Sequence, residues 1–344
     1  MRTAINPFRN SNSPFQVSMV TNFFTSSVIS NGAEENQCLN VRDKFRFTPR
    51  HTPVMVKEVF NFLIPETQSD EGGLIVDATV GLGGHLAYLS QNSSRQFTFL
   101  GIDIDPDAVA YSRERFKDAD NVIIQEGNYV ELPEMIRKIG FDYISGVLFD
   151  FGIGRFQLEA LENRGFSFLR EAPLDMRFAQ KGQTALDLLR TISLRELERI
   201  LRDYGNEPHY RKVARVIMEK RRQIKTTRDL REILFAIAPK GKRIKTCQRV
   251  FLSLRIAVNQ ELVNLRQGIE KVMPILKEKG RMVTISYHSG EDRIIKEIFR
   301  GKEKEKVIMI LTPKPIRPTN DEILKNPQAR SAKLRAIEKI KREI

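Results

Sequence analysis

The segment VDATVGLGGH, residues 76–85, places three glycines between an aspartate and a histidine. The apolar, partly β-branched residues 74–76 before it predict a buried strand, and the spacing of Leu86 and Leu89 predicts a helix after it. Glycines at the carboxyl end of a strand let the backbone approach a ligand closely. The segment is therefore typical of a nucleotide-type cofactor site. A tight turn between strand and helix, with no ligand, is the alternative.

Three carboxylates, Asp77, Asp103 and Asp150, come at the ends of expected strands. The carboxyl ends of parallel strands meet at one edge of a sheet, so these acids are expected to face one crevice. Such a cluster repels a pyrophosphate and attracts the positive sulfonium and amino groups of S-adenosylmethionine. The third glycine of a dinucleotide fingerprint is also missing after Gly81 and Gly83. The sequence thus favours S-adenosylmethionine over NAD, although Asp77 has the alternative role of capping its own loop.

Strands and helices alternate from residue 51 onward. Continuous apolar strands that alternate with helices indicate an α/β protein with a doubly wound parallel sheet. Asp105 and Pro106 are typical of a helix start. Strands are expected at residues 74–80, 97–105, 121–127 and 143–152, and helices at residues 54–64, 85–91, 107–116 and 132–140.

Helical patterns replace the strands between residues 156 and about 265. The clearest helices are expected over residues 193–205 and 207–222, and the second has one apolar face surrounded by arginine and lysine. A helix over residues 263–280 and a strand over residues 281–288 then resume the α/β pattern. The helical part is therefore an insertion into one sheet. A basic helix is expected near the C-terminus, within residues 313–344.

The net charge is +14, and it is unevenly distributed over the 344 residues. Residues 1–154 have a balance of −6, residues 155–265 of +11, and residues 266–344 of +9. This asymmetry predicts a small-ligand site in the first part and a polyanion, most plainly a nucleic acid, at the second. Lysines and arginines that serve only solubility are the alternative.

Other features of the sequence narrow the class of protein. The two cysteines, Cys38 and Cys247, stand apart and only four histidines occur, which argues against a disulfide framework or a structural zinc site. No long apolar window predicts a membrane span. We expect residues 1–48, which are rich in Asn and Ser, to form a disordered extension. A cytoplasmic location fits best, and organellar import directed by the N-terminus is the alternative.

Nine motifs, taken together, resemble the bacterial 16S ribosomal RNA (cytosine(1402)-N(4))-methyltransferase family. The resemblance covers about residues 49–340 and implies a Rossmann-like class I S-adenosylmethionine-dependent methyltransferase fold with an inserted helical subdomain. It implies methylation of the exocyclic amine of a cytosine in the small ribosomal subunit. The motifs are HTPVMVKEV, DATVGLGGH, GIDIDPDA, LFDFGIGRFQL, NRGFSF, PLDMR, SLRIAVNQEL, SYHSGEDR and NPQARSAKLR.

The resemblance also implies a division of the chain and a set of site residues. The methyltransferase domain is expected over residues 49–156 and 266–344, with the RNA-recognition subdomain over residues 157–265. We predict Asp150, His288 and Asp292 as catalytic, with Ser289 as a further candidate beside them. The implied cofactor site comprises Gly83, Gly84, His85, Asp103, Tyr129, Asp150 and Gln157.

Physical roles can be argued for several of these residues. Loop amides suit the methionine carboxylate, Asp103 suits the ribose, and the ring of Tyr129 suits adenine, unless that ring is only part of the core. His85 is expected to be a hydrogen-bond donor rather than a base, because amine methylation needs an oriented lone pair more than a strong base. The predicted RNA contacts are Arg211, Lys212, Arg215 and Arg222.

The chain departs from the family pattern at two places. Residues 154–156 are Gly-Arg-Phe where two serines and a proline are usual, and Tyr287 and Gly290 stand where Phe and Leu are usual. Both lie by the expected target pocket, so they bear on cytosine placement and not on cofactor binding. A ribosome assembly factor with weakened or altered activity is the main alternative function, and a protein methyltransferase is a third. The expected partner is 16S ribosomal RNA, and a homodimer is compatible with this function.

Overall fold

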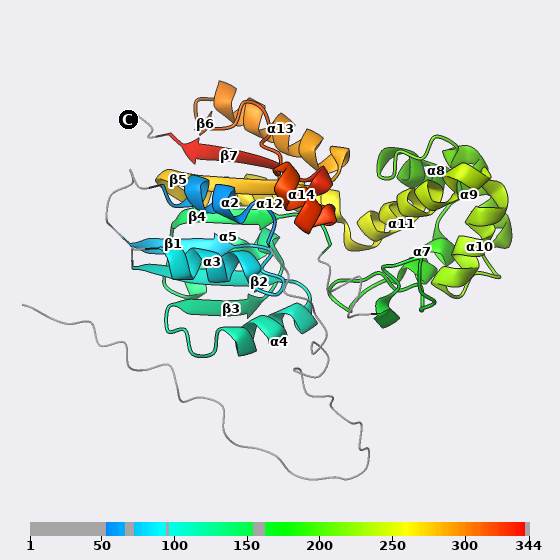
Figure 1. Cartoon of the computed structure of the whole chain (residues 1–344), viewed down its shortest axis with the longest axis horizontal. Coiled ribbons are helices and arrows are strands. Elements are labelled where there is room, and N and C mark those ends of the chain that lie inside the picture. The colour runs from blue at the N-terminus through cyan, green and yellow to red at the C-terminus, as the bar shows by residue number, and fades with distance from the viewer. Residues whose placement is uncertain (1–52, 66–71, 94–95, 154–161, 341–344) are drawn as a thin grey trace, which may run out of the picture. The chain divides into compact units, whose positions relative to one another are not determined.

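The computed structural model of the protein describes residues 53–65, 72–93, 96–153 and 162–340. Its centre is a seven-stranded sheet with the strand order β3-β2-β1-β4-β5-β7-β6 (Figure 1). Strands β1 to β5 pair in parallel, while β7 runs antiparallel to both β5 and β6. The strands are β1 Gly73–Asp77, β2 Phe97–Asp103, β3 Val122–Glu126, β4 Ile144–Asp150, β5 Leu276–Ser286, β6 Ile308–Ile310 and β7 Lys333–Lys339.

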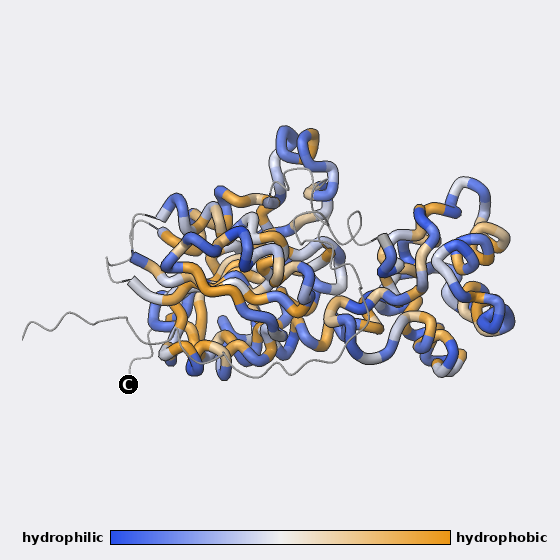
Figure 2. Tube along the Cα trace, turned by 90° about the horizontal axis from the view of Figure 1, so that it is seen from below, coloured by the Kyte–Doolittle hydropathy of each residue, from blue (hydrophilic) through white to orange (hydrophobic). Residues whose placement is uncertain are grey.

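Both faces of the sheet are buried, as the continuous apolar strands predict. Leu74 and Val76 of β1 belong to one core cluster, and Ile75 between them belongs to the other. The first cluster includes residues of α5 (Leu132–Lys138), α12 (Glu261–Val272) and α13 (Ser289–Lys304), and the second includes α2 (Val56–Leu63) and α3 (Gly84–Asn92). Hydrophobic residues accordingly follow the strands in Figure 2. The doubly wound arrangement is therefore confirmed.

Helix α4 (Pro106–Arg115) begins as its sequence predicts. The Asp105 side chain accepts a hydrogen bond from the Asp107 amide, and Pro106 occupies the first helical position. The four strands and four helices expected in the first half all form, and their ends differ from the predicted ones by a few residues.

Among the residues that the structure describes, five α-helices form the insertion between β4 and β5. They enclose a hydrophobic core of their own, to which Leu197, Ile217 and Leu254 belong. Because β4 and β5 pair directly, the insertion interrupts one sheet, as predicted. The helices are α7 Ala185–Thr191, α8 Leu194–Asp203, α9 Tyr210–Lys220, α10 Thr227–Ile237 and α11 Arg243–Asn259.

The helix predicted over residues 263–280 is too long. Helix α12 ends at Val272, a 3-10 turn covers Met273–Ile275, and β5 already begins at Leu276. Pro274 cannot continue the α-helical hydrogen bonds, which accounts for this end. Lys279 has a positive φ of 59°, and the register between β4 and β5 shifts within the same stretch. The first half of β5 is therefore irregular, which hides the strand from pattern analysis.

The prediction of a basic helix near the C-terminus is wrong. Residues 333–339 form strand β7, and the helix in this segment is the short α14 (Asn320–Lys325). Leu334 and Ala336 belong to the core on one face of the sheet, while Arg335 lies between them in the strand and binds Asp292 of α13. Apolar and charged side chains that alternate along the chain are typical of a strand.

The sheet order and the single reversed strand are those of a Rossmann-like class I S-adenosylmethionine-dependent methyltransferase fold, as predicted. Within the described ranges, no helix combines the length and apolar character needed to cross a membrane. The N-terminal extension predicted over residues 1–48 lies outside the described residues.

Candidate active site

A cavity of about 720 Å³ lies at the carboxyl ends of β1, β2 and β4. Residues of the sheet and of the insertion line it together, so a ligand in it contacts both parts. This edge of the sheet is where the glycine loop and strand-end acids were expected to meet. The sheet side contributes Gly81, Gly84, His85, Asp103, Tyr129 and Asp150, and the insertion contributes Arg177, Phe178, Lys181, Arg255 and Asn259.

The glycine loop needs glycine at two positions. Gly81 and Gly83 have positive φ angles of 51° and 74°, which favour glycine. At Gly83 a Cβ atom would also lie 2.5 Å from the Phe116 ring. Gly83 is the N-cap of α3, and no side chain caps this helix. The N-terminal amides of α3 therefore have no side-chain acceptor, which suits an anionic group of a ligand.

Asp103 lines the cavity and also holds the glycine loop. Its Oδ2 accepts from the Gly81 amide and its Oδ1 from the Asp105 amide, both at 2.9 Å. Burial raises the pKa of Asp103 to about 6. Each carboxylate oxygen has a second lone pair, so Asp103 can accept ribose hydroxyls without releasing the loop.

Asp77 directly precedes the lining residues Ala78 and Thr79 and does not itself line the cavity. Its Oδ1 accepts from the Thr79 amide at 3.2 Å, so the alternative role of capping its own loop is present. Its Oδ2 is buried and has no hydrogen-bond partner among the described residues. Burial raises the pKa of Asp77 to about 7. The Asp77 carboxyl group is therefore partly protonated at neutral pH.

Asp150 lies at the end of β4 with its side chain in the cavity. The Tyr287 hydroxyl donates to Oδ1 at 2.9 Å, and His85 Nδ1 lies 3.6 Å from Oδ2. Thr79 Oγ1 accepts from the Asp150 amide at 2.8 Å and fixes the backbone. Burial raises the pKa of Asp150, while His85 and Tyr287 act in the opposite direction. Asp150 is the acid best placed to meet a reacting group.

The His85 ring lies between the Asp150 carboxylate and the backbone at Val54. Its Nε2 lies 2.9 Å from the Val54 carbonyl, which only accepts, so Nε2 carries a proton. The ring is almost fully buried, and its Nδ1 faces Asp150. His85 is therefore a hydrogen-bond donor to the backbone at Val54, and its role toward the cofactor stays a prediction.

Tyr129 lines the cavity from a 3-10 turn, Tyr129–Glu131, just after β3. Its ring packs edge-on against Phe149 and Phe151, and a Cβ atom on Gly268 would come within 2.5 Å of it. Burial raises the pKa of its hydroxyl far above the ordinary value. The ring is therefore both a core aromatic and a wall of the cavity, so the two predicted roles are compatible.

Of the two other predicted catalytic residues, His288 lines the cavity and Asp292 does not. His288 lines the cavity, but it is the N-cap of α13: its Nδ1 accepts from the Gly290 and Glu291 amides and its Nε2 lies 3.0 Å from Glu291 Oε1. Asp292 is not among the lining residues, and its oxygens accept from Lys333 and Arg335. Their catalytic roles stay predictions. Gln157 lies outside the described residues, as do residues 154–156.

The predicted RNA-binding residues lie on the insertion, away from the cavity lining. Arg211, Lys212, Arg215 and Arg222 are exposed on α9 and just after it. The Arg211 guanidinium lies over the Tyr210 ring, 5.3 Å from its centroid. None of the four is among the residues that line the cavity.

Sequence analysis missed an ion pair that lines the cavity. Arg255 Nε and Nη2 donate to the two Glu261 oxygens at 2.8 and 2.9 Å, in bidentate geometry. Asn259 lies between them in sequence; its Oδ1 accepts from the Phe178 amide and its Nδ2 donates to the Met176 carbonyl. The sequence signal for this pair is an arginine and a glutamate six residues apart within the motif SLRIAVNQEL.

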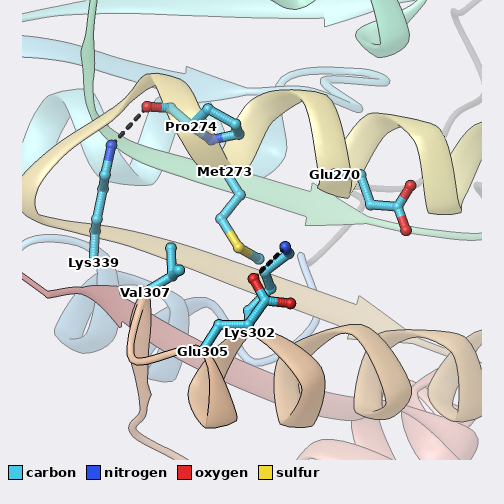
Figure 3. A pocket seen from close by; sticks show the side chains of 7 residues that line it. All are labelled: Glu270, Met273, Pro274, Lys302, Glu305, Val307 and Lys339. Carbon is cyan, nitrogen blue, oxygen red and sulfur yellow. Dashed lines mark hydrogen bonds and ion pairs between the residues drawn. The ribbon is translucent and has the colours of Figure 1, made fainter.

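A second cavity, of about 530 Å³, lies near the C-terminal end of α12 (Figure 3). Lys339 donates to the Pro274 carbonyl, and Lys302 pairs with Glu305. Its charged groups are thus already partnered, and none of the predicted site residues lines it. The cavity at the strand ends remains the candidate active site.

Comparison with known proteins places the chain in a family. The sequence profile of the MraW methylase family matches residues 48–340. The chain is 41% identical over 292 residues to a Ribosomal RNA small subunit methyltransferase H of Coprothermobacter proteolyticus, covering 84% of this chain and 96% of that one. It is 40% identical to a protein of the same name from Persephonella marina, covering 84% and 99%. Among solved structures, a rRNA methylase from Streptococcus thermophilus aligns over 83% of this chain and 96% of its own with 14% identity and a TM-score of 0.40. The chain belongs to the MraW methylase family.

Proposed function

We propose that the chain transfers a methyl group to the exocyclic N4 of a cytosine in 16S ribosomal RNA, at position 1402 by family resemblance. The observation that carries this proposal is Asp150, a half-buried carboxylate in a cavity that the glycine loop and the insertion share. A small cofactor can occupy the loop side while a nucleotide enters from the side of the insertion. The relatives named above, small-subunit ribosomal RNA methyltransferases, support the choice of RNA.

S-adenosylmethionine is the methyl donor, and the residues of the cavity suit it. The uncapped N-terminus of α3 suits the methionine carboxylate, and Asp103 suits the ribose hydroxyls. Burial raises the pKa of both Asp77 and Asp150, and a cationic sulfonium bound in the cavity would favour their ionised forms. When bound, the cofactor supplies an electrophilic methyl group.

Asp150 is the residue that we assign to the target amine. Its carboxylate can accept a hydrogen from N4, which turns the nitrogen lone pair toward the methyl group. The same oxygen can hold the proton that N4 must lose once it has gained a fourth bond. His288 is less suited to this task, because hydrogen bonds of its own helix cap already engage Nδ1.

The insertion offers phosphate contacts through α9. On the neighbouring α8, Arg199 pairs with Glu196 and Arg202 with Asp203. By contrast, Arg211, Lys212, Arg215 and Arg222 make no ion pair with a carboxylate of the described chain. Their charges are therefore available to a polyanion, which supports RNA as the partner.

Mapping methylated cytosines in small-subunit RNA from cells with and without the protein tests the target. We expect loss of one N4-methylcytosine in the cells that lack it, and its return when purified protein and S-adenosylmethionine are added to the subunits. Asp150→Asn should fold and bind cofactor but restore the methyl group slowly. Asp142→Asn is the matched control, because Asp142 is exposed and lies two residues before β4 begins. Binding to subunits without methylation would instead favour an assembly factor.

A further inference from the structure

Tyr287 is held at both its backbone and its side chain directly after β5. Its amide donates to Glu291 Oε2 at 2.8 Å, and its ring packs so closely on the backbone that a Cβ atom at Gly152 would lie 3.0 Å away. Its hydroxyl donates to Asp150 Oδ1 at 2.9 Å. The hydroxyl therefore has little freedom to leave Asp150.

This contact fixes which oxygen of Asp150 remains available. Oδ1 is occupied by Tyr287, while Oδ2 lies 3.6 Å from His85 Nδ1, beyond an ordinary hydrogen bond. The backbone of Asp150 is held independently by Thr79. Rotation of the carboxylate about its last bond is thus restrained chiefly by Tyr287.

We propose that Tyr287 is a positioning residue for methyl transfer, whose hydroxyl locks the Asp150 carboxylate so that Oδ2 faces the target amine. The inference rests on the proposed function, since it assigns the amine to Asp150. Tyr287 does not itself touch the reacting atoms in this role.

The same hydrogen bond bears on the charge of Asp150. Burial raises the pKa of this carboxyl, His85 from α3 and the Tyr287 hydroxyl lower it, and Glu291 from α13 raises it. Asp77 of β1 is a further acid that interacts with it. A hydroxyl that donates to the carboxylate stabilises its ionised form, so its removal favours the protonated form, which cannot accept from an amine.

Tyr287→Phe removes only the hydroxyl and keeps the ring. Under single-turnover conditions with saturating S-adenosylmethionine, we expect a rate about tenfold lower at acidic pH, because a hydrogen bond to a charged group is lost. The acid limb of the pH–rate profile should move to higher pH, and cofactor affinity should stay within about twofold of the parent. Tyr88→Phe, whose ring packs on Phe60 outside the cavity, is the matched control and should keep the parent profile.

A titration that needs no RNA separates this inference from the proposed function. In carbon NMR of protein labelled at aspartate side chains, the Asp150 carboxyl should titrate at higher pH in Tyr287→Phe than in the parent. An unchanged titration, or an unchanged pH–rate profile in an active enzyme, would overturn the role of Tyr287. If the titration moves but the parent does not methylate small-subunit RNA, the proposed function fails while the contact between Tyr287 and Asp150 stands.

Discussion

Asp103 combines two tasks in one side chain. It accepts from the Gly81 amide of the glycine loop, and it faces the cavity where ribose hydroxyls are expected. Replacement therefore removes a ligand contact and loosens the loop that shapes the site. A cofactor-binding assignment made from the end of a strand could not separate these effects.

Asp103→Ala should weaken S-adenosylmethionine binding by about 1 to 3 kcal/mol, through loss of charge-assisted hydrogen bonds. Asp103→Asn should lose less, because the amide oxygen still accepts from one backbone amide. Calorimetric titration measures both affinities, and Asp142→Asn serves as the exposed control. A dissociation constant unchanged in Asp103→Ala would remove this residue from the site.

Cofactor affinity should rise with pH. Burial raises the pKa of Asp103 from 3.8 to about 6 and that of Asp77 from 3.8 to about 7. These groups stabilise the free protein most below pH 3.8, and that contribution is lost as pH rises through 6 to 7. A cationic ligand favours their ionised forms, so its binding should strengthen over the same window.

The dissociation constants of S-adenosylmethionine and S-adenosylhomocysteine, measured between about pH 5 and pH 8, check this expectation. The second ligand lacks the sulfonium charge, so its affinity should rise less steeply. Equal slopes for the two ligands would show that neither acid senses the sulfonium.

At the scale of elements, helix α3 depends on the residue that begins it. Gly83→Ala should destabilise the protein by about 1 to 2 kcal/mol or more, because its φ of 74° disfavours any other residue and the new methyl meets Phe116. Gly301→Ala lies within α13 with nothing near the added methyl, and should stabilise by about 0.5 to 1 kcal/mol. Thermal or urea unfolding compares the two. Equal effects would mean that the backbone at Gly83 relaxes easily.

Sequence patterns predicted the strands that are buried on both faces and the acids that end them. Asp103 and Asp150 lie in the cavity because the carboxyl ends of parallel strands meet there. Strand β7 was missed because its basic residues, Lys333 and Arg335, are neutralised by Asp292, a partner about forty residues away. The contact between Tyr287 and Asp150 joins residues 137 apart and has no local pattern.

Helix α9 should contribute affinity for RNA that does not depend on sequence. Replacing Arg211, Lys212, Arg215 and Arg222 together with Gln keeps helix propensity and the apolar face, so stability should change little. The variant should bind small-subunit RNA more weakly and with a flatter dependence on salt, because fewer cations are released from the RNA. Cofactor affinity, measured in parallel, should not change. If the variant binds RNA with the affinity and salt dependence of the parent, the RNA contact must lie on another basic surface.

At the scale of the whole molecule, one buried ion pair connects the sheet to the segment that leads into the insertion. Arg164 donates to both Asp105 oxygens at 2.9 Å and also to the carbonyls of Arg177 and Phe178. Phe178 lines the cavity, and the Asp105 amide donates to Asp103. The Arg164 guanidinium thus links the cofactor side of the cavity to the insertion side.

Arg164→Met should therefore have two effects. It leaves the Asp105 side chain, which is fully buried, without its counter-ion, which should cost about 3 to 5 kcal/mol of stability. It should also weaken S-adenosylmethionine binding, since Asp103 loses support through Asp105 and Phe178 keeps only the contact of its amide with Asn259. Arg228→Met breaks exposed pairs with Glu171 and Glu232 and should cost less than about 1 kcal/mol with no change in cofactor affinity. Unfolding curves and calorimetry measured on both variants decide the matter: if Arg164→Met is destabilised but binds cofactor as the parent does, the pair holds the fold and does not couple the two sides of the cavity.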